Sequence, residues 1–197
     1  MHTKQIALLG GSFNPPGLHH RRIVEFLTKH FDEVCVLPCG LRPDKMFGNV
    51  TTSQRAEMLA LTFSGMENVA LDLSDIAKTE FTRAIDLDAR LKKELGAEIT
   101  HVIGGDLVRG GAEGKSEIQT AWHRGPEVWE NLRFAVLARH GYEVAPEDLP
   151  PQAELFKVNF PGSSTEIRAR RKQGRQINGL VMPAVARYIE ENNLYRL

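Results

Sequence analysis

The segment Gly10-Gly-Ser-Phe-Asn-Pro-Pro-Gly-Leu-His-His20 combines residue types that could bind a phosphate group. Its glycines allow a ligand to approach the backbone closely, and Pro15 and Pro16 restrict the turn. A helix that starts after the prolines would present backbone N–H groups to an anion. We therefore predict a phosphate-binding loop, with a tight strand-to-helix turn as the alternative. Adjacent helical residues point about 100° apart, so we expect only one of His19 and His20 to face the ligand.

The segment Gly162-Ser-Ser-Thr-Glu-Ile-Arg168 is a second candidate for binding an anion. Ser163, Ser164 or Thr165 can cap a helix that carries Arg168 in its first turns. A helix N-terminus, hydroxyl groups and an arginine fork together suit a polyphosphate. A capped surface helix that happens to be basic is the alternative. The two segments support each other only if both reach one crevice.

The segment Gly104-Gly-Asp106 is a third candidate, because it follows the apolar run Ile99 to Ile103. Asp106 could bind a ribose hydroxyl or a hydrated cation, with an ordinary turn residue as the alternative. The segment is not a GxGxxG fingerprint, which disfavours a Rossmann dehydrogenase.

Apolar runs that could form buried strands alternate with segments of helical spacing, which predicts an α/β fold with a doubly wound, Rossmann-like parallel sheet. The expected strands are 5–9, 34–37, 69–73, 99–103, 134–137 and 155–158. The expected helices are 18–30, 53–63 with Thr52 or Ser53 as cap, 82–95, 164–172 and 183–192, the last two forming a small C-terminal helical extension. Ligands of such sheets bind beyond the carboxyl ends of the strands, so we expect the site there.

Composition narrows the class of protein. The 197 residues include 25 Lys and Arg against 25 Asp and Glu, so no net charge attracts nucleic acid or a membrane surface. The two cysteines, Cys35 and Cys39, are expected to be free thiols, and the seven histidines lack the spacing of a metal site. With no apolar run of about 18 residues and no signal-peptide pattern, we expect a cytoplasmic protein.

Two of these segments match known signatures. The first resembles the GxFxPxHxGH signature of the nucleotidylyltransferase superfamily, and Ser163-Ser-Thr-Glu-Ile-Arg168 resembles its SSTxxR signature. Within that superfamily, the chain resembles the bacterial nicotinate or nicotinamide mononucleotide adenylyltransferases over nearly its whole length. Supporting elements follow in the family's order: Gln54 to Met58, Phe81-Thr82, Gly104 to Asp106, Trp122, Ala138-Arg139 and Tyr188 to Arg196.

The resemblance implies transfer of an adenylyl group from ATP to a pyridine mononucleotide, which yields a dinucleotide and pyrophosphate in NAD biosynthesis. It implies Mg²⁺ as the counter-ion of ATP rather than a metal held by the protein. It also implies one nucleotidylyltransferase-like domain over residues 1–197, in which residues 160–197 complete the ATP site. ATP and the mononucleotide are the expected ligands, without nucleic acid or membrane, and the oligomeric state stays open between monomer and homo-oligomer.

Carried over by position, the resemblance assigns catalytic roles to His20 and Arg168. The residues it assigns to ATP are Gly10, Gly11, Ser12, Phe13, His20, Gly104, Asp106, Ser163, Ser164, Thr165 and Arg168. Those it assigns to the mononucleotide are Asn14, Lys45, Thr82, Trp122 and Arg139, with the tryptophan stacking on the pyridine ring.

Two positions depart from the family pattern. The first histidine of HxGH falls on Gly17 and the motif glycine falls on His19, while Gly162 stands where an apolar residue is usual. Two alternatives therefore stay open: a non-catalytic nucleotide-binding relative, and another enzyme of the superfamily, such as a pantetheine-phosphate adenylyltransferase or a cytidylyltransferase. The preference between nicotinate and nicotinamide mononucleotide is open as well.

Overall fold

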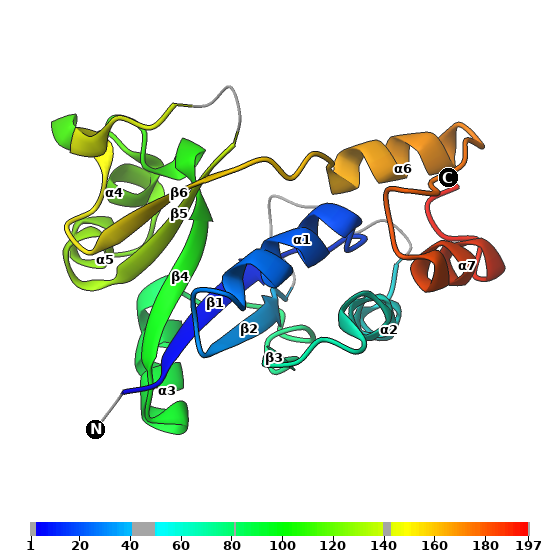
Figure 1. Ribbon diagram of the computed structural model, residues 1–197, viewed down its shortest axis with the longest axis horizontal. Helices are drawn as coiled ribbons and strands as arrows, with labels where there is room; N and C mark the ends of the chain where they lie inside the picture. The colour runs from blue at the N-terminus through cyan, green and yellow to red at the C-terminus, as the bar shows by residue number, and fades with distance from the viewer. Residues whose placement is uncertain (1–2, 41–49, 81, 140–142, 197) are drawn as a thin grey trace. The chain divides into compact units, whose positions relative to one another are not determined.

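Six apolar segments form one parallel sheet in the computed structural model, which describes residues 3–40, 50–80, 82–139 and 143–196. The strands are β1 (Gln5–Gly11), β2 (Glu33–Pro38), β3 (Val69–Leu71), β4 (Glu98–Gly104), β5 (Arg133–Arg139) and β6 (Ala153–Val158) (Figure 1). Their order is β3-β2-β1-β4-β5-β6, and β1 pairs with β4 from Gln5 opposite Glu98 to Leu8 opposite His101. The strand order reverses between β1 and β4, as in doubly wound sheets. The predicted fold class is confirmed.

Seven α-helices and three short 3₁₀ turns lie between or after the strands in the part of the chain that the structure describes. The helices are α1 (Leu18–Leu27), α2 (Thr52–Phe63), α3 (Ala84–Leu95), α4 (Glu117–Ala121), α5 (Gly125–Asn131), α6 (Ser164–Lys172) and α7 (Pro183–Glu191). The 3₁₀ turns are η1 (Gly105–Leu107), η2 (Gly111–Glu113) and η3 (Pro146–Asp148). All five predicted helices are present, but α4 and α5 were not predicted.

The cap predicted for the second helix was wrong. Thr51, rather than Thr52 or Ser53, precedes α2 in an extended conformation. Its hydroxyl accepts a hydrogen bond of 3.2 Å from the Gln54 backbone N–H, and the Gln54 side-chain oxygen accepts one of 2.9 Å from the Thr51 N–H. This reciprocal pair is a capping box, and the helix therefore starts at Thr52, earlier than a cap at either Thr52 or Ser53 would allow.

The chain divides into two compact units. The first contains Met1–Leu9, Phe31–Glu33 and Thr82–Asn159, and the second contains Gly10–His30, Val34–Phe81 and Phe160–Leu197. The core of the first unit is built from side chains of β4, β5 and the short helices: Ile103, Val108, Ile118, Val128, Trp129, Leu132, Phe134 and Val136. Both cysteines are buried free thiols, as predicted. No helix in the described ranges has both the length and the apolar composition to span a membrane.

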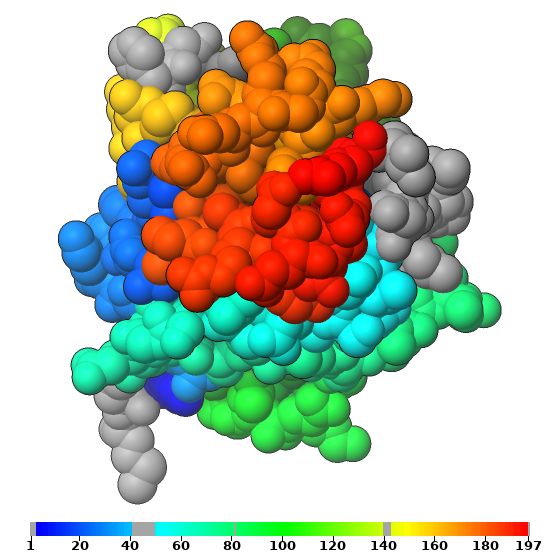
Figure 2. Space-filling view, turned by 90° about the vertical axis from the view of Figure 1, so that its right-hand side faces the viewer, coloured from blue at the N-terminus to red at the C-terminus, as the bar shows by residue number. Residues whose placement is uncertain are grey.

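The core of the second unit fixes the position of α6. Ile167 of α6 is buried with Met58 of α2 and with Val185 and Ile189 of α7. Burying each side chain of this size contributes about 1.5–3 kcal/mol. The helices α6 and α7 lie side by side on one face of this unit, with α2 next to α7 (Figure 2). The helix that begins with the second signature is therefore held by packing along its apolar side.

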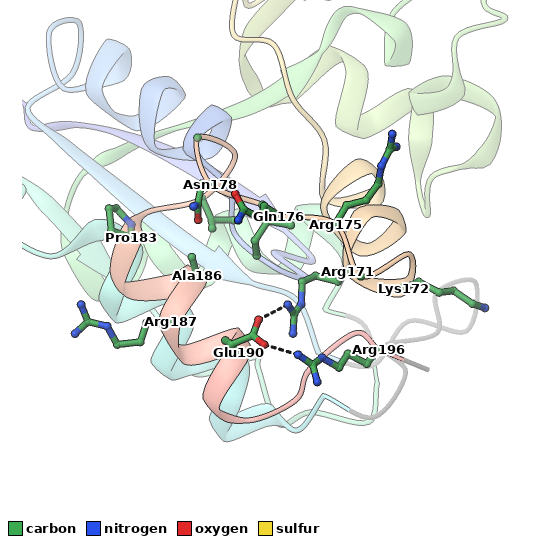
Figure 3. A pocket seen from close by; sticks show the side chains of 14 residues that line it. Arg171, Lys172, Arg175, Gln176, Asn178, Pro183, Ala186, Arg187, Glu190 and Arg196 are labelled. Atoms are coloured by element: carbon green, nitrogen blue, oxygen red, sulfur yellow. Dashed lines mark hydrogen bonds and ion pairs between the residues drawn. The ribbon is translucent and has the colours of Figure 1, made fainter.

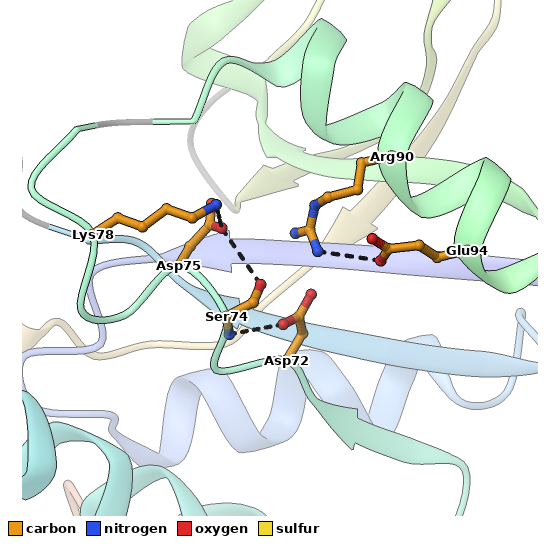
Figure 4. Close-up of polar contacts among 6 residues, drawn as sticks. All are labelled: Asp72, Ser74, Asp75, Lys78, Arg90 and Glu94. Atoms are coloured by element: carbon orange, nitrogen blue, oxygen red, sulfur yellow. Dashed lines mark hydrogen bonds and ion pairs between the residues drawn. The ribbon is translucent and has the colours of Figure 1, made fainter.

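The chain after β3 turns sharply and packs against the end of β2. The Asp72 carboxylate accepts a hydrogen bond of 2.9 Å from the Ser74 N–H, and Lys78 pairs with Asp75 at 2.5 Å (Figure 4). A Cβ atom at Gly40 would lie 2.4 Å from the carbonyl oxygen of Lys78, closer than any real contact. Position 40 therefore requires glycine, because this turn occupies the space of a side chain.

Candidate functional site

The loop after β1 is held in one conformation by its own side chains. Phe13 has a φ angle of 45°, in the left-handed region that bulky residues rarely adopt. Its ring lies over Gly11, where an added Cβ would be 3.1 Å from two ring atoms. The ring also makes an edge contact with the imidazole of His20, with ring centroids 4.9 Å apart. Strained backbone of this kind persists where the surrounding structure fixes it, as at ligand-binding sites.

His20 stands in the first turn of α1 with a defined orientation. Its Nδ1 accepts a hydrogen bond of 3.0 Å from the backbone N–H of Gly17, the residue that precedes the helix. Because Nδ1 is the acceptor, the neutral ring carries its proton on Nε2. That nitrogen can therefore donate a hydrogen bond to a phosphate oxygen.

The second signature begins α6. Ser163 is the N-cap, as one of the three predicted candidates, and its hydroxyl accepts a hydrogen bond of 3.1 Å from the Glu166 N–H. Ser164, Thr165 and Arg168 follow on the first turns of the helix, and none of the three is buried. Arg168 donates a hydrogen bond of 3.1 Å to the Thr165 hydroxyl. Hydroxyls, a helix N-terminus and a guanidinium group thus lie together, as the sequence predicts for an anion site.

The two signature segments contact each other directly within the second unit. The Ser164 hydroxyl donates a hydrogen bond of 2.8 Å to the carbonyl oxygen of Pro15, and Arg168 donates one of 2.7 Å to the carbonyl oxygen of Asn14. The guanidinium group has five N–H donors, more than its bonds to Asn14 and Thr165 use, so it can also bind a phosphate. The guanidinium donors of the second segment therefore lie beside the backbone of the first, about 150 positions earlier in the sequence.

Asn14 is buried, and its side chain has a structural partner. The hydroxyl of Tyr195 donates a hydrogen bond of 2.6 Å to Asn14 Oδ1. Burial raises the pKa of Tyr195 above its ordinary value, although the charges of Arg168 and Arg55 oppose the rise. Tyr195 therefore stays protonated and keeps this bond. Sequence reasoning gave Tyr195 no role, and its only signal was the matching chain ending, Tyr188 to Arg196.

Arg55 of α2 is a second buried residue that supports the loop and that sequence reasoning did not place in the site. Its guanidinium donates a hydrogen bond of 2.7 Å to the carbonyl oxygen of Cys39. The Cys39 N–H in turn donates one of 2.9 Å to the carbonyl oxygen of Gly11. A buried arginine thus links α2 to the glycines of the loop through backbone atoms. Its signal in the sequence was its place in the supporting element Gln54 to Met58.

The remaining predicted residues lie in the first unit or outside the described residues. Gly104 ends β4, and the Asp106 carboxylate folds over it, so that a Cβ at Gly104 would be 2.3 Å from Asp106 Oδ1. Trp122 ends α4 and packs against the core of the first unit. Arg139 ends β5, and Thr82 precedes α3. Lys45, predicted to bind the mononucleotide, and Phe81 are not among the described residues.

A cavity of about 770 Å³ lies away from the signature residues, between the end of α6 and α7 (Figure 3). Glu190 pairs there with both Arg171 and Arg196, which ties the two helices to the C-terminal residues. Arg171 is buried, and its Nε and Nη2 make no hydrogen bond with any residue that the structure describes. Elsewhere in the described ranges, no three His, Cys, Asp or Glu side chains are grouped so that they could hold a metal ion.

The sequence and the fold match those of known proteins. The cytidylyltransferase-like family matches residues 8–170. A protein of Borrelia hermsii named "Probable nicotinate-nucleotide adenylyltransferase" is 30% identical over 97% of this chain and 97% of its own. Two structures of the Plasmodium falciparum nicotinic acid mononucleotide adenylyltransferase match 98% of this chain and 97% of theirs. The one complexed with NaAD has a TM-score of 0.74 at 21% identity, and the one complexed with APC has a TM-score of 0.72 at 20% identity.

Proposed function

Because this chain belongs to the cytidylyltransferase-like family, and within it to the nicotinate and nicotinamide mononucleotide adenylyltransferases, we propose that it transfers an adenylyl group from ATP to nicotinate or nicotinamide mononucleotide. The products would be the dinucleotide and pyrophosphate. The complexes of the Plasmodium relative with NaAD and APC support this class of ligand.

The structural observation that best supports the proposal is that hydrogen bonds join the two candidate anion-binding segments, Gly10 to His20 and Gly162 to Arg168. Ser164 and Arg168 bond to the carbonyl oxygens of Pro15 and Asn14 at 2.8 and 2.7 Å. The acceptors of both bonds are backbone carbonyl oxygens of the loop after β1. The bonds therefore place the Arg168 guanidinium group, and the Thr165 hydroxyl that it contacts, beside this loop. A polyphosphate chain needs several donors, which the guanidinium group, the Thr165 hydroxyl and the N-terminus of α6 would supply.

The proposed reaction needs no nucleophile from the protein. A phosphate oxygen of the mononucleotide attacks the α-phosphorus of ATP, a new P–O bond forms, and the bond to the bridging oxygen of the β-phosphate breaks. Pyrophosphate leaves with the electron pair of that bond. The protein has to align two anions and stabilise the charge that develops on the phosphate oxygens.

The residues of this chain would divide that work. The side chains of Arg168 and Thr165, with the backbone N–H groups of Ser164 and Thr165 at the start of α6, would bind the phosphates that leave as pyrophosphate. His20 would donate a hydrogen bond from Nε2 to the transferred phosphate, because its Nδ1 is held by the Gly17 N–H. Mg²⁺ would arrive with ATP, bound by phosphate oxygens. The guanidinium group of Arg168 and the hydroxyl of Thr165 would bind phosphate oxygens that the ion does not.

For the mononucleotide, we propose the residues that the resemblance assigns to it. We propose Trp122 for stacking on the pyridine ring, Thr82 and Arg139 for polar contacts, and Lys45 for the phosphate. Asn14 would act mainly through its backbone, because its side-chain oxygen is taken by Tyr195.

The test is to mix the protein with ATP, Mg²⁺ and either mononucleotide, and to measure pyrophosphate release and the dinucleotide. We expect turnover with at least one of the two. Binding of ATP in calorimetry without turnover of either would identify a non-catalytic nucleotide-binding relative. Turnover of CTP or of phosphopantetheine instead would identify another enzyme of the superfamily.

A further inference from the structure

The imidazole ring of His19 occupies the space that a side chain at position 17 would fill. A Cβ atom placed on Gly17 would lie 2.7 Å from both Cε1 and Nδ1 of His19. It would also lie 3.0 Å from the δ-methyl group of Ile167, on α6. His19 is buried, with 5% of its surface exposed, so its ring is confined to this space.

The backbone gives no other reason for glycine at position 17. Its φ and ψ angles are −112° and 173°, an extended conformation that any residue adopts. The absence of a side chain at 17 is therefore explained by the ring that lies over it. The histidine at 19 and the glycine at 17 depend on each other.

The same ring contacts His20 and the segment before α6. The ring centroids of His19 and His20 are 3.9 Å apart, with the planes tilted by 40°. On another side, a Cβ atom at Gly162 would be 3.1 Å from His19 Nδ1, and Gly162 has a φ angle of 127°, which favours glycine. The His19 ring is thus in contact with the loop after β1, with the ring of His20 and with the approach to the second signature.

We infer that His19 is a positioning residue for the adenylyl transfer proposed above, on which this inference rests. Relative to the HxGH signature, histidine and glycine have exchanged places at positions 17 and 19, and the His19 ring lies over Gly17. This ring holds the His20 ring in the orientation that directs Nε2 to the transferred phosphate. His19 acts through His20, because the two imidazole rings are in contact.

Two single variants disturb the His19 ring from opposite sides. In His19→Ala the ring is lost, and we expect kcat to fall about tenfold with less than about a twofold change in KM for ATP, because a misplaced catalytic group lowers the rate more than the binding. In Gly17→Ala every side chain is kept, but the new methyl group displaces the ring, and we expect kcat to fall in the same direction. His30→Ala, an exposed histidine after α1, is the matched control and should keep the wild-type kcat.

The exchange itself can be reversed. The double variant Gly17→His/His19→Gly moves the imidazole to position 17 and removes the His19 ring, which would otherwise clash with a side chain there. We expect its kcat to return to within about threefold of wild type, whereas a residue that only stabilised the fold would show its effect in the melting temperature and not in kcat. Circular dichroism and thermal melting of each variant verify folding.

The results separate this inference from the proposed function. An inactive wild-type chain would defeat both. An active wild type beside a His19→Ala variant of equal kcat would defeat only the inference, as would a folded double variant no faster than His19→Ala. If His19→Ala does not fold, Gly17→Ala decides, because a wild-type kcat in that variant contradicts a positioning role for the ring.

Discussion

Arg168 Nη1 donates a hydrogen bond of 2.7 Å to the carbonyl oxygen of Asn14, a residue 154 positions earlier in the chain. The bond joins the first turns of α6 to the loop after β1. It gives the guanidinium a fixed place beside the hydroxyl of Thr165, to which it also donates. A cation fixed in this way can bind a phosphate without first losing the rotational freedom of a long side chain.

Replacing Arg168 should therefore weaken ATP binding and the reaction together. We expect Arg168→Ala to lower kcat/KM for ATP by about 10- to 100-fold, since a hydrogen bond to a charged group contributes about 1.5–3 kcal/mol. Arg168→Lys keeps the charge but not the forked guanidinium group, so its kcat/KM should lie between those of wild type and Arg168→Ala. Steady-state kinetics at varied ATP measure this. Arg170→Ala is the matched control, because Arg170 pairs with Glu166 on the exposed side of the same helix.

Tyr195 should support the loop through Asn14. Tyr195→Phe removes the donor to a buried amide oxygen, and we expect the free energy of unfolding to fall by about 1–2 kcal/mol at neutral pH. Urea unfolding followed by fluorescence measures the loss. Tyr188→Phe, at a half-buried position on α7, serves as control and should change stability less.

The effect of Tyr195 should also depend on pH. Burial raises the pKa of Tyr195 in the folded protein above the ordinary tyrosine value of about 10. Above that pH the unfolded chain loses the proton while the folded protein keeps it, so the free energy of unfolding falls as pH rises. The phenylalanine variant cannot show this contribution. The stability difference between wild type and Tyr195→Phe should therefore shrink above about pH 10, and a constant difference up to pH 11 would contradict the assignment.

Apart from α4 and α5, the succession of strands and helices along the chain could be predicted from the sequence, because particular residues mark where the elements begin and end. Gly10-Gly11 and Gly104-Gly105 end apolar runs, and Pro183 stands at the first turn of α7, so the element boundaries carry their own signals. The helices α4 and α5 were missed because five and seven residues are too few to establish a helical period. Leu95, the last residue of α3, is 44% exposed because the helix ends there, before Gly96.

The candidate site was predictable only as two separate segments. Phosphate-binding residue types can be recognised locally in Gly10 to His20 and in Ser163 to Arg168. The bond between Tyr195 and Asn14 spans 181 positions and leaves no local pattern. The contact between Gly17 and His19 was hidden for another reason: two residues apart, they do not share a face of an ideal helix, and only Gly17's place before the helix lets the ring lie over it.

A buried ion pair network in the first unit should set part of the protein's acid sensitivity. Burial alone would raise the pKa of Asp88, but hydrogen bonds from His101 and Lys92, each at 3.0 Å, outweigh it and hold the pKa below its usual value. The carboxylate therefore stabilises the fold above the ordinary aspartate pKa of about 3.9, and this stabilisation is lost as pH falls through that value and below. We expect Asp88→Asn to lower the free energy of unfolding at pH 7 by about 1–3 kcal/mol.

Denaturant unfolding of Asp88→Asn at pH 7 and between pH 5 and 3 measures this effect. The difference from wild type should begin to narrow as pH falls below about 3.9, because the unfolded wild-type chain then takes up a proton at Asp88 more readily than the folded protein does. The matched control is Glu94→Gln, which removes an exposed ion pair with Arg90 on the same helix and should cost less than about 1 kcal/mol. Equal losses for the two variants at pH 7 would mean that burial of Asp88 adds nothing to its interactions.

His20 should affect the rate more than the binding of ATP. The Gly17 N–H fixes Nδ1 as an acceptor, so Nε2 carries the proton of the neutral ring and can contact the charge that develops on the transferred phosphate. Removing a donor of this kind usually lowers kcat by about 10²–10³, while ground-state binding changes little. We therefore expect His20→Ala to lower kcat by about 10² or more with ATP affinity near that of wild type, measured by steady-state kinetics and calorimetry. His20→Gln, whose amide N–H can still donate, should recover part of the loss. If His20→Ala matched wild type in kcat, the hydrogen bond to the phosphate would have to come from another residue, and His19 would be the first to examine because its ring is in contact with that of His20.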